Sequence, residues 1–428
     1  MADEFARRDF LKKSAAAAAF AAPAVHSARG ANGKINIGWI GAGTRGYHCI
    51  QVMAEANKDK VQVLSVCDAY QGNLNRGKDR IQTIWGNTPK TTVDYREVLA
   101  DRNIDAVFIM TPEHLHYPMM LAALKAGKHV YVEKPLAHTI EEGAELVAAA
   151  RKAGKIVQVG TQNRSSALYQ RARQMVQDGM IGDCHYVRAF WYRNSPETNP
   201  AWRYSIPADT TPENTDWERF LGPAPKRPFD KRRYFQWRLY WDYSGGISTD
   251  LLVHQTDITN FVLGKTVPLT CMASGGIYRW TDPSDDRDVP DTLSAIYDYP
   301  DQFHLNYSCY FGNDHYGYGE QFCGNEGTIE VISRQDLHFY PQLLRGQASE
   351  KVKARREIHL NGMKDFGEPD GLRRHITNFI ESIRGNEKPV APVEAGQQAA
   401  ISGHMATQSY KSGKKVKWDE KAEKLIML

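Results

Sequence analysis

A glycine-rich turn early in the chain has the spacing of a dinucleotide-binding loop. Residues 35–40 are an apolar run that predicts a strand, and the stretch GAGTRG at residues 41–46 joins it to a predicted helix over residues 47–56. Gly41 would allow a tight turn, Gly43 close approach of the backbone to a pyrophosphate, and Gly46 close helix packing. Thr44 and Arg45 lie in this turn, before the helix, whose N-terminus offers amide donors to phosphates. The alternative is an ordinary glycine-rich turn.

An acidic residue at the end of the next predicted strand supports the first interpretation. Asp68 follows the β-rich run at residues 61–66. A carboxylate there would accept a hydrogen bond from a ribose 2′-hydroxyl and would repel a 2′-phosphate. The pattern therefore predicts NAD as the cofactor and makes NADP the less favoured one. Arg76 nearby would soften that preference.

A lysine at the end of another strand is a candidate for proton transfer. Residues 130–132 predict a buried strand, and Glu133, Lys134 and Pro135 follow at its carboxyl end. Ligands of open α/β sheets bind at that edge. The positive charge of a nicotinamide and partial desolvation would lower the pKa of Lys134, which suits it to proton transfer or to holding a substrate hydroxyl. The alternative is an exposed lysine at a strand end.

A carboxylate and a histidine lie four residues apart in the stretch GGISTDLLVHQTD. Asp250 and His254 would share one face of a helix. Histidine suits proton transfer near neutral pH, and a carboxylate one turn away would orient it or hold a second hydroxyl. The alternative for His254 is a buried core histidine with its hydrogen bonds satisfied.

Two smaller features of the sequence, an aromatic cluster and a histidine pair, are relevant to ligand binding. Trp237 and Tyr243 belong to an aromatic cluster, YFQWRLYWDY, which would either stack on sugar rings or fill a core. His114 and His116 have the spacing of a metal pair, but no cysteine or carboxylate cluster accompanies them. We therefore expect no metal site.

The elements that must position these residues indicate an α/β fold. Up to Gly160, short apolar strands alternate with helices, which predicts a parallel sheet covered on both faces. Residues 33–160 are therefore expected to form an NAD(P)-binding Rossmann domain. After Gly160 the strands become longer and alternating, with a hairpin predicted to turn at Pro300-Asp301 and a late helix from about Asp370 to Gly385. Residues 161–428 are expected to form a substrate-binding and oligomerisation α+β domain with an open, largely antiparallel mixed sheet.

Bulk composition excludes several classes of protein. The 428 residues carry a net charge of +4 with dispersed charges, which argues against nucleic-acid binding. No apolar run reaches the roughly 20 residues that span a bilayer, so no integral membrane span is expected. Six cysteines without a CxxC pair indicate neither a zinc framework nor a disulfide scaffold.

The first 32 residues resemble a twin-arginine (Tat) export signal. Arg7 and Arg8 precede Phe10-Leu11-Lys12, an alanine-rich stretch follows, and Ala22-Pro23-Ala24 is one possible cleavage site. The order of these features predicts a periplasmic or otherwise exported protein. The alternative is a charged, disordered tail.

Taken together, the motifs resemble those of the glucose–fructose oxidoreductase / inositol dehydrogenase / MocA (Gfo/Idh/MocA) family. GWIGAGTRG, VCDAY, TPEHLHYPMMLAALKAGKHVYVEKPLA, VGTQNR and GGISTDLLVHQTDITNFVLG follow the family pattern in order, from about Lys34 to the C-terminus. The resemblance implies a Rossmann domain followed by an open-faced sheet that lays substrate over the nicotinamide. It also implies a homodimer or homotetramer formed through the flat face of the second sheet.

The same resemblance assigns roles to individual residues. Lys134 and His254 look like the catalytic pair, with Asp250 as a substrate-holding partner. The remaining site residues expected from it are Thr111, Pro112, His116 and Glu133 on the cofactor side, and Gln162 and Arg164 in the cleft.

The expected function is oxidation of a carbinol of a sugar or glycoside, for example at C3, by hydride transfer to NAD. Tat export moves folded protein, so a tightly bound cofactor would travel with it and be recycled in place by a second substrate or an external acceptor. One alternative is an NAD-dependent redox glycosidase, which oxidises C3 of the sugar, eliminates the aglycone, adds water and returns the hydride. That branch of the family tends to lack the lysine of the EKP motif, which this chain keeps. A second alternative is a non-catalytic sugar-binding protein, against which Lys134, Asp250 and His254 argue.

Overall fold

A parallel sheet with a nucleotide-binding strand order forms the first domain. The computed structural model describes residues 33–342, 355–368 and 371–428, so the expected export signal lies outside the described residues. The sheet has the order β3-β2-β1-β4-β5-β6, and all neighbouring strands are parallel. Its strands are β1 (Ile35–Ile40), β2 (Val61–Cys67), β3 (Lys90–Thr92), β4 (Ala106–Ile109), β5 (His129–Val132) and β6 (Val157–Val159). The strand order reverses between β1 and β4, which is where ligands of such sheets bind.

Helices cover both faces of this sheet, as the near-continuous apolar strands predict. They are α2 (Thr44–Asn57), α3 (Gln71–Trp85), α4 (Tyr95–Ala100), α5 (His116–Lys125) and α6 (Ile140–Ala153). Helix α6 shows why the chain folds this way locally. A reciprocal capping box of Thr139 and Glu142 begins it, and Gly154, with a φ of 57°, ends it.

The second domain is built on a ten-stranded mixed sheet. Its order is β14-β13-β12-β11-β7-β10-β9-β8-β15-β16, in which β7 and β10 pair in parallel and the other pairs given are antiparallel. Its strands are β7 (Cys184–Tyr192), β8 (Thr270–Gly276), β9 (Thr292–Tyr299), β10 (Phe303–Tyr310), β11 (Tyr318–Gly324), β12 (Gly327–Ile332), β13 (Asp336–Pro341), β14 (Ile358–Asn361), β15 (Val416–Asp419) and β16 (Lys424–Met427). The predicted hairpin is β9–β10, with Phe303 opposite Tyr299. The predicted fold class is thus confirmed.

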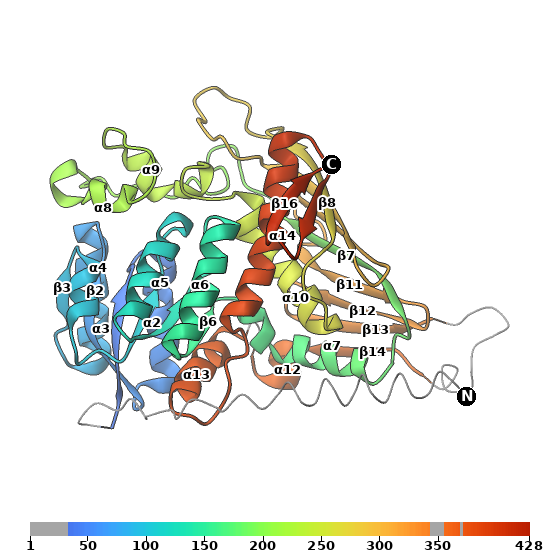
Figure 1. Cartoon of the computed structure of the whole chain (residues 1–428), viewed down its shortest axis with the longest axis horizontal. Coiled ribbons are helices and arrows are strands. Elements are labelled where there is room, and N and C mark those ends of the chain that lie inside the picture. The colour runs from blue at the N-terminus through green and yellow to red at the C-terminus, as the bar shows by residue number, and fades with distance from the viewer. Residues whose placement is uncertain (1–32, 343–354, 369–370) are drawn as a thin grey trace.

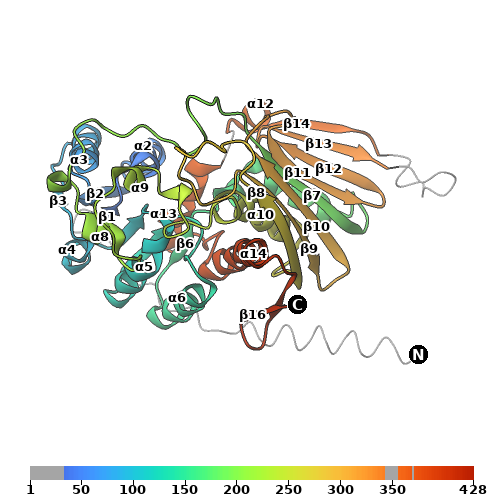
Figure 2. The ribbon, with the colours of Figure 1, turned by 90° about the horizontal axis from the view of Figure 1, so that it is seen from above.

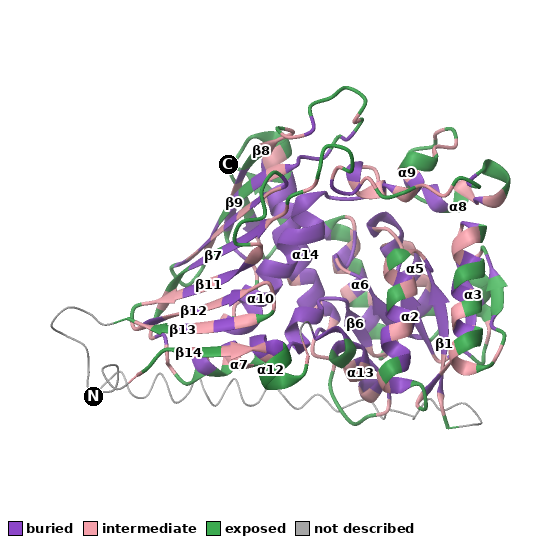
Figure 3. Cartoon of the chain, turned by 180° about the vertical axis from the view of Figure 1, so that it is seen from behind, coloured by how far each residue is buried: buried purple, intermediate pink, exposed green. Residues whose placement is uncertain are grey.

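Helices lie between the second sheet and the first domain. Helices α7 (Ala167–Gln177), α10 (Val253–Leu263) and α14 (Val393–Ser412) pack on the inner face of the sheet (Figures 1 and 2). Helix α10 is almost entirely buried, and α14 is largely buried up to its exposed C-terminal end (Figure 3). Helix α14 joins the two cores, because Ala400 packs with the first domain and Met405 with the second.

One late helix completes the first domain rather than the second. The predicted helix is α13 (Leu372–Ile383), and its apolar residues, including Ile376 and Phe379, pack in the same core as β1, β2 and β4. The expected division at Gly160 leaves this helix in the second domain. An apolar periodicity marks the buried face of a helix without identifying the sheet that buries it.

A long segment between β7 and α10 lies across the carboxyl ends of the first domain's strands. We call residues 193–245 the covering segment; it includes α8 (Trp217–Leu221) and α9 (Lys231–Phe235), seen above helices α2 to α6 in Figure 1. It is fastened to the loop after β2, where the Tyr70 hydroxyl donates to Asp209 at 2.7 Å and the Asp216 amide donates to Ala69 O at 2.8 Å. None of the described helices is long and apolar enough to cross a membrane.

Candidate active site

The glycine-rich loop has the geometry that its spacing predicts. Gly41 follows β1 with a φ of 94°, and a Cβ there would lie 2.7 Å from the carbonyl oxygen of Met110. A Cβ on Gly46 would collide with the carbonyl oxygen of Gly41. At Gly43, which precedes α2, a Cβ would meet only the Asn73 side chain, at 3.8 Å. The loop therefore leaves open space in front of the helix N-terminus, where a pyrophosphate fits.

A cavity of about 750 Å³ opens beside this loop, within the size range of ligand sites. Its walls come from the carboxyl ends of the strands of the first sheet and from the part of the covering segment between residues 204 and 238. The predicted residues that line it are Gly41, Gly43, Thr44, Arg45, Asp68, Thr111, Pro112, Glu133, Lys134 and Trp237. Among the described residues no group of histidine, cysteine and carboxylate side chains could hold a metal ion.

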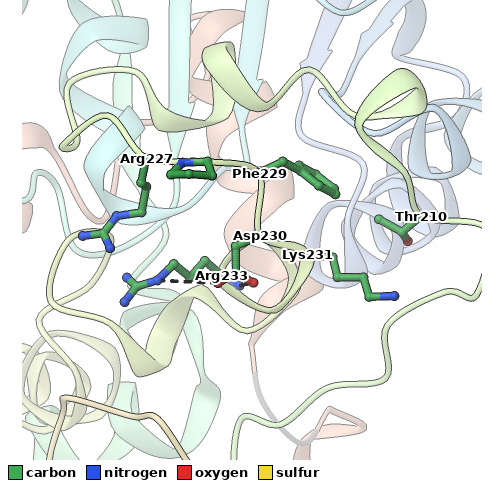
Figure 4. A pocket seen from close by; sticks show the side chains of 7 residues that line it. Thr210, Arg227, Phe229, Asp230, Lys231 and Arg233 are labelled. Carbon is green, nitrogen blue, oxygen red and sulfur yellow. Dashed lines mark hydrogen bonds and ion pairs between the residues drawn. The ribbon is translucent and has the colours of Figure 1, made fainter.

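A second, shallower pocket lies on the outer part of the covering segment. It is lined by Thr210, Arg227, Pro228, Phe229, Asp230, Lys231 and Arg233 (Figure 4). Its arginines are largely paired, since Arg233 contacts Asp230 and Arg227 contacts Asp242. None of the residues with predicted chemistry lines it, so the candidate site is the larger cavity.

Asp68 lies at the end of the cavity expected for the adenosine ribose. Its Oδ2 accepts from the Ala42 amide at 2.7 Å, and its Oδ1 accepts from the Tyr70 amide and the Tyr234 hydroxyl, both at 2.9 Å. Burial raises the pKa of Asp68, and these hydrogen bonds oppose that effect. Tyr234 belongs to α9, so the covering segment contacts the carboxylate on which the cofactor prediction depends.

Lys134 and Asp250 form a buried ion pair across the two domains. Lys134 Nζ donates to Asp250 Oδ1 at 2.8 Å and to its backbone oxygen at 2.6 Å. Arg238, from the covering segment, donates through Nε to the same Oδ1 at 3.0 Å, and its guanidinium lies 4.2 Å from the ring centre of Trp237. Burial alone would raise the pKa of Asp250, but the two cations hold it well below its usual value. Asp250 is therefore ionised throughout the neutral range.

His254 follows Asp250 on the same helical segment. Asp250 lies in a π-helical turn, Ser248–Leu252, which leads into α10 at Val253. The His254 Nδ1 atom is buried without a hydrogen-bond partner, and the Trp191 ring centre lies 5.9 Å from the imidazole. Burial, together with nearby cations, lowers the pKa of His254 well below 6.5. The imidazole is consequently neutral at pH 7 and able to accept a proton.

Glu113 was not predicted from the sequence, yet it binds the start of the helical segment that carries Asp250 and His254. It is 1% exposed in the loop after β4. It accepts from the Ser244 hydroxyl at 3.1 Å, the Gly245 amide at 3.0 Å and the Thr249 hydroxyl at 2.7 Å. The only sequence indication was its place in the TPEH stretch at a strand end.

We expect Glu113→Gln to lower the free energy of unfolding by about 1.5–3 kcal/mol, because an amide nitrogen would face donors that the carboxylate now satisfies. Urea unfolding measures this. Glu55→Gln, at an exposed ion pair with Arg373, is the matched control and should change stability by less than about 1 kcal/mol. Equal, small losses in both variants would contradict the interdomain role of Glu113.

Several predicted site residues lie away from the cavity lining. His116 is buried with Nδ1 2.7 Å from Pro135 O and Nε2 3.0 Å from Thr111 O, so it holds two loops together. Arg164 is committed to Asp257, with Nε 2.8 Å from Oδ1.

Likewise absent from the cavity lining are Gly46, Asp250 and His254. The remaining residues of this group are also buried. Gln162 is 6% exposed. Tyr243 is fully buried, with its ring beside those of His114 and Phe220, so its position differs from the predicted contact with sugar. This place in an aromatic core agrees with the alternative that the sequence left open, namely that the aromatic cluster fills a core.

An aromatic pair that the sequence did not indicate lies beside His254 instead. The rings of Trp191, on β7, and Tyr318, on β11, stack with centres 4.5 Å apart. The guanidinium of Arg334, in the turn after β12, lies 5.1 Å from each ring centre. These residues are brought together by strand pairing between distant parts of the chain, which leaves no local pattern.

Family comparisons cover most of the chain. The profile of the oxidoreductase family with an NAD-binding Rossmann fold (GFO_IDH_MocA) matches residues 35–161, and its C-terminal alpha/beta domain matches residues 225–418. A myo-inositol 2-dehydrogenase of Thermotoga maritima is 23% identical over 90% of this chain and 99% of that protein.

Other curated relatives match over only part of their length. An uncharacterized oxidoreductase of Bacillus subtilis is 27% identical over 55% of either chain. A 1,5-anhydro-D-fructose reductase of Ensifer adhaerens is 30% identical, and the match spans 42% of its length. A glycosyl hydrolase family 109 protein of Shewanella baltica is 34% identical over 28% of this chain and 27% of that one.

Solved structures share the fold over nearly the whole chain. Levoglucosan dehydrogenase in complex with NADH and levoglucosan superposes with a TM-score of 0.67 at 18% identity, covering 92% of this chain and 99% of that one. An oxidoreductase domain protein from Kribbella flavida gives a TM-score of 0.71 at 21% identity, over 90% of this chain and 100% of that one.

Proposed function

This chain belongs to the Gfo/Idh/MocA oxidoreductase family, and from that premise we propose that it oxidises a carbinol of a sugar or glycoside and keeps its NAD bound between turnovers. The observation that carries this proposal is the Lys134–Asp250 pair, placed where the wall of the cofactor cavity meets the helix that bears His254. The relatives support a polyhydroxylated substrate, since they include a myo-inositol 2-dehydrogenase, a 1,5-anhydro-D-fructose reductase and a levoglucosan dehydrogenase.

The residues of the cavity fit a dinucleotide. The open space at Gly43, the amides at the start of α2 and the carboxylate of Asp68 would hold its pyrophosphate and ribose. When bound, NAD supplies the hydride acceptor. Asp68 favours NAD over NADP because its charge repels a 2′-phosphate.

Proton handling is divided between two side chains in this proposal. His254 is neutral with an unpaired ring nitrogen, so it takes the hydroxyl proton of the substrate. Lys134, held by Asp250, presents its positive charge to the oxygen that loses the proton and stabilises the negative charge there. Asp250 stays ionised and fixes the lysine rather than receiving the proton.

Retention of the cofactor is supported by the covering segment. It contacts the first domain at Asp68 through Tyr234, at Tyr70 through Asp209 and at Asp94 through Arg219. A dinucleotide in the cavity would leave only after contacts of this kind opened, so we propose slow release.

The deciding experiment is anaerobic. Protein as purified, with no added NAD, is mixed with a panel of glycosides, and both reduced-nicotinamide absorbance and released aglycone are recorded. A single stable rise in absorbance without aglycone is the expected result. Many turnovers of aglycone release without net absorbance change would replace the proposal by a redox glycosidase, for example one that begins at C3. Sugar binding without either signal would indicate a non-catalytic binding protein.

We also propose that the protein is exported with its cofactor through the Tat-like sequence at Arg7 and Arg8. A reporter fusion should lose export when both arginines become lysine, and unchanged export would overturn this.

We further propose a homodimer or homotetramer formed through the outer face of the second sheet, which exposes Tyr186, Ile296 and Tyr340. Sedimentation of the full chain as a monomer would contradict it.

A further inference from the structure

Two arginines flank Trp191, beside His254, without an acidic partner among the described residues. The guanidinium carbon of Arg334 lies 5.1 Å from the Trp191 ring centre, and that of Arg193 lies 5.2 Å from it. Neither side chain forms an ion pair within the described part of the chain, where Arg45, Arg164 and most other arginines of the interior do. The Arg334 cation is also the nearby charge that most lowers the pKa of His254.

The unpaired atoms of Arg334 form one edge of its guanidinium. Nε and Nη2 are both excluded from solvent and lack a hydrogen-bond partner. An arginine binds a carboxylate through this edge by two parallel hydrogen bonds. Arg164 binds a carboxylate through the same edge in this molecule, since its Nε lies 2.8 Å from Asp257 Oδ1 and 2.9 Å from Oδ2, and its Nη2 lies 2.8 Å from Oδ1. Buried unpaired donors cost free energy and are rare, so they call for a partner that the chain itself does not provide.

The acidic groups around this position form no ion pair with either arginine among the described residues, although Glu320 keeps its Oε1 without a hydrogen-bond partner. Asp250 is held by Lys134 and Arg238. Glu320, on β11, accepts from the Tyr169 hydroxyl at 2.6 Å, and burial raises its pKa to about 7, with Arg334 acting in the opposite direction. Near neutral pH, Glu320 therefore carries only part of a charge and does not balance two arginines.

We propose that the substrate is a sugar acid whose carboxylate binds the Nε–Nη2 edge of Arg334, while a carbinol of the same molecule faces His254. The guanidinium of Arg193 also lies near the Trp191 ring, and it adds a second positive charge to this anion subsite. A neutral sugar would leave the buried Nε and Nη2 atoms of Arg334 without a charged partner. This inference rests on the proposed function in one respect only, because it names the class of substrate which that function would use.

The test compares acids with their neutral counterparts in binding. D-Glucuronate and D-galacturonate, against D-glucose and D-galactose, are titrated calorimetrically into the purified full chain with its bound cofactor. We expect the acids to bind at least about tenfold more tightly, as a bidentate charged contact implies. Arg334→Gln should abolish that preference, and Arg334→Lys should retain part of it. Arg188→Gln, on the exposed opposite face of β7, should leave the preference unchanged.

Each outcome decides the inference. Equal binding of acids and neutral sugars overturns it, and so does a preference that survives Arg334→Gln, which would leave Arg334 with a structural role only. If Arg334→Gln does not fold, the wild-type comparison and its weakening by salt decide alone. Binding needs no turnover, so an acid preference without reduction of the cofactor would remove the dehydrogenase proposal and keep this one. Turnover of neutral sugars without acid preference would do the reverse.

Discussion

Replacement of His254 by asparagine is expected to lower kcat by about 10²–10⁴-fold while the protein stays folded and keeps its NAD, because a positioned general base contributes that much. The imidazole is buried, neutral and unpaired at Nδ1, four residues after Asp250, which pairs with the cavity residue Lys134. Asparagine matches its shape roughly and keeps a polar group but does not accept the proton. Single-turnover reduction of the bound cofactor measures the effect without interference from cofactor recycling.

The pH profile gives an independent check on the same residue. Because the folded pKa of His254 is lowered below 6.5, the imidazole remains the free base as pH falls through 6.5, and the rate should not decline there. His304→Asn, at a half-buried histidine on the outer face of the sheet, is the matched control and should leave kcat unchanged. A wild-type rate in His254→Asn would transfer the role of base to Lys134.

The cofactor side of the site could be predicted from sequence because its geometry is local. One strand, one turn and one helix determine the positions of Gly41, Gly43 and Gly46, and the end of the next strand places Asp68 beside them. Lys134 follows from the same logic, since the carboxyl ends of parallel strands meet at one edge of a sheet. The local motifs therefore predicted several of the residues that line the cavity, but Gly46 is not among its lining residues.

The substrate side depended on contacts that no local pattern records. Trp191 and Tyr318 meet only because β7 and β11 pair antiparallel, and alternation along either strand shows a buried face without showing its neighbour. Tyr243 and Trp237 belong to one aromatic stretch, yet the first fills a core and the second lines the cavity. Composition alone does not separate these two roles, because aromatic rings suit both.

The spacing of Asp250 and His254 illustrates an intermediate case. Four residues predicted a shared helix face, and the structure does place both on one helical segment, but the turn that holds Asp250 is π-helical. Such turns occur often at functional sites. Glu113 binds the Gly245 amide and the Thr249 hydroxyl at this turn, so the local geometry depends on a residue of the other domain.

Replacement of Asp250 by alanine is expected to lower the free energy of unfolding by about 3–5 kcal/mol, because removing one member of a buried ion pair leaves the others uncompensated. Lys134 and Arg238 both donate to this carboxylate, and its side chain is 9% exposed. Urea unfolding at pH 7 measures the loss. The matched control is Glu394→Ala, at an ion pair with Arg151 in which both side chains are exposed, where we expect a change of less than about 1 kcal/mol.

The pH dependence of stability distinguishes the charge of Asp250 from its packing. The folded pKa of Asp250 lies below its unfolded value, so its contribution is fully present above the unfolded pKa of about 3.9 and is lost as pH falls toward the folded pKa. The difference in stability between wild type and Asp250→Ala should therefore shrink on acidification below about pH 4. A difference that stays constant with pH would mean that the carboxylate acts through packing alone. The ion pair would then not be the interdomain contact that positions Lys134.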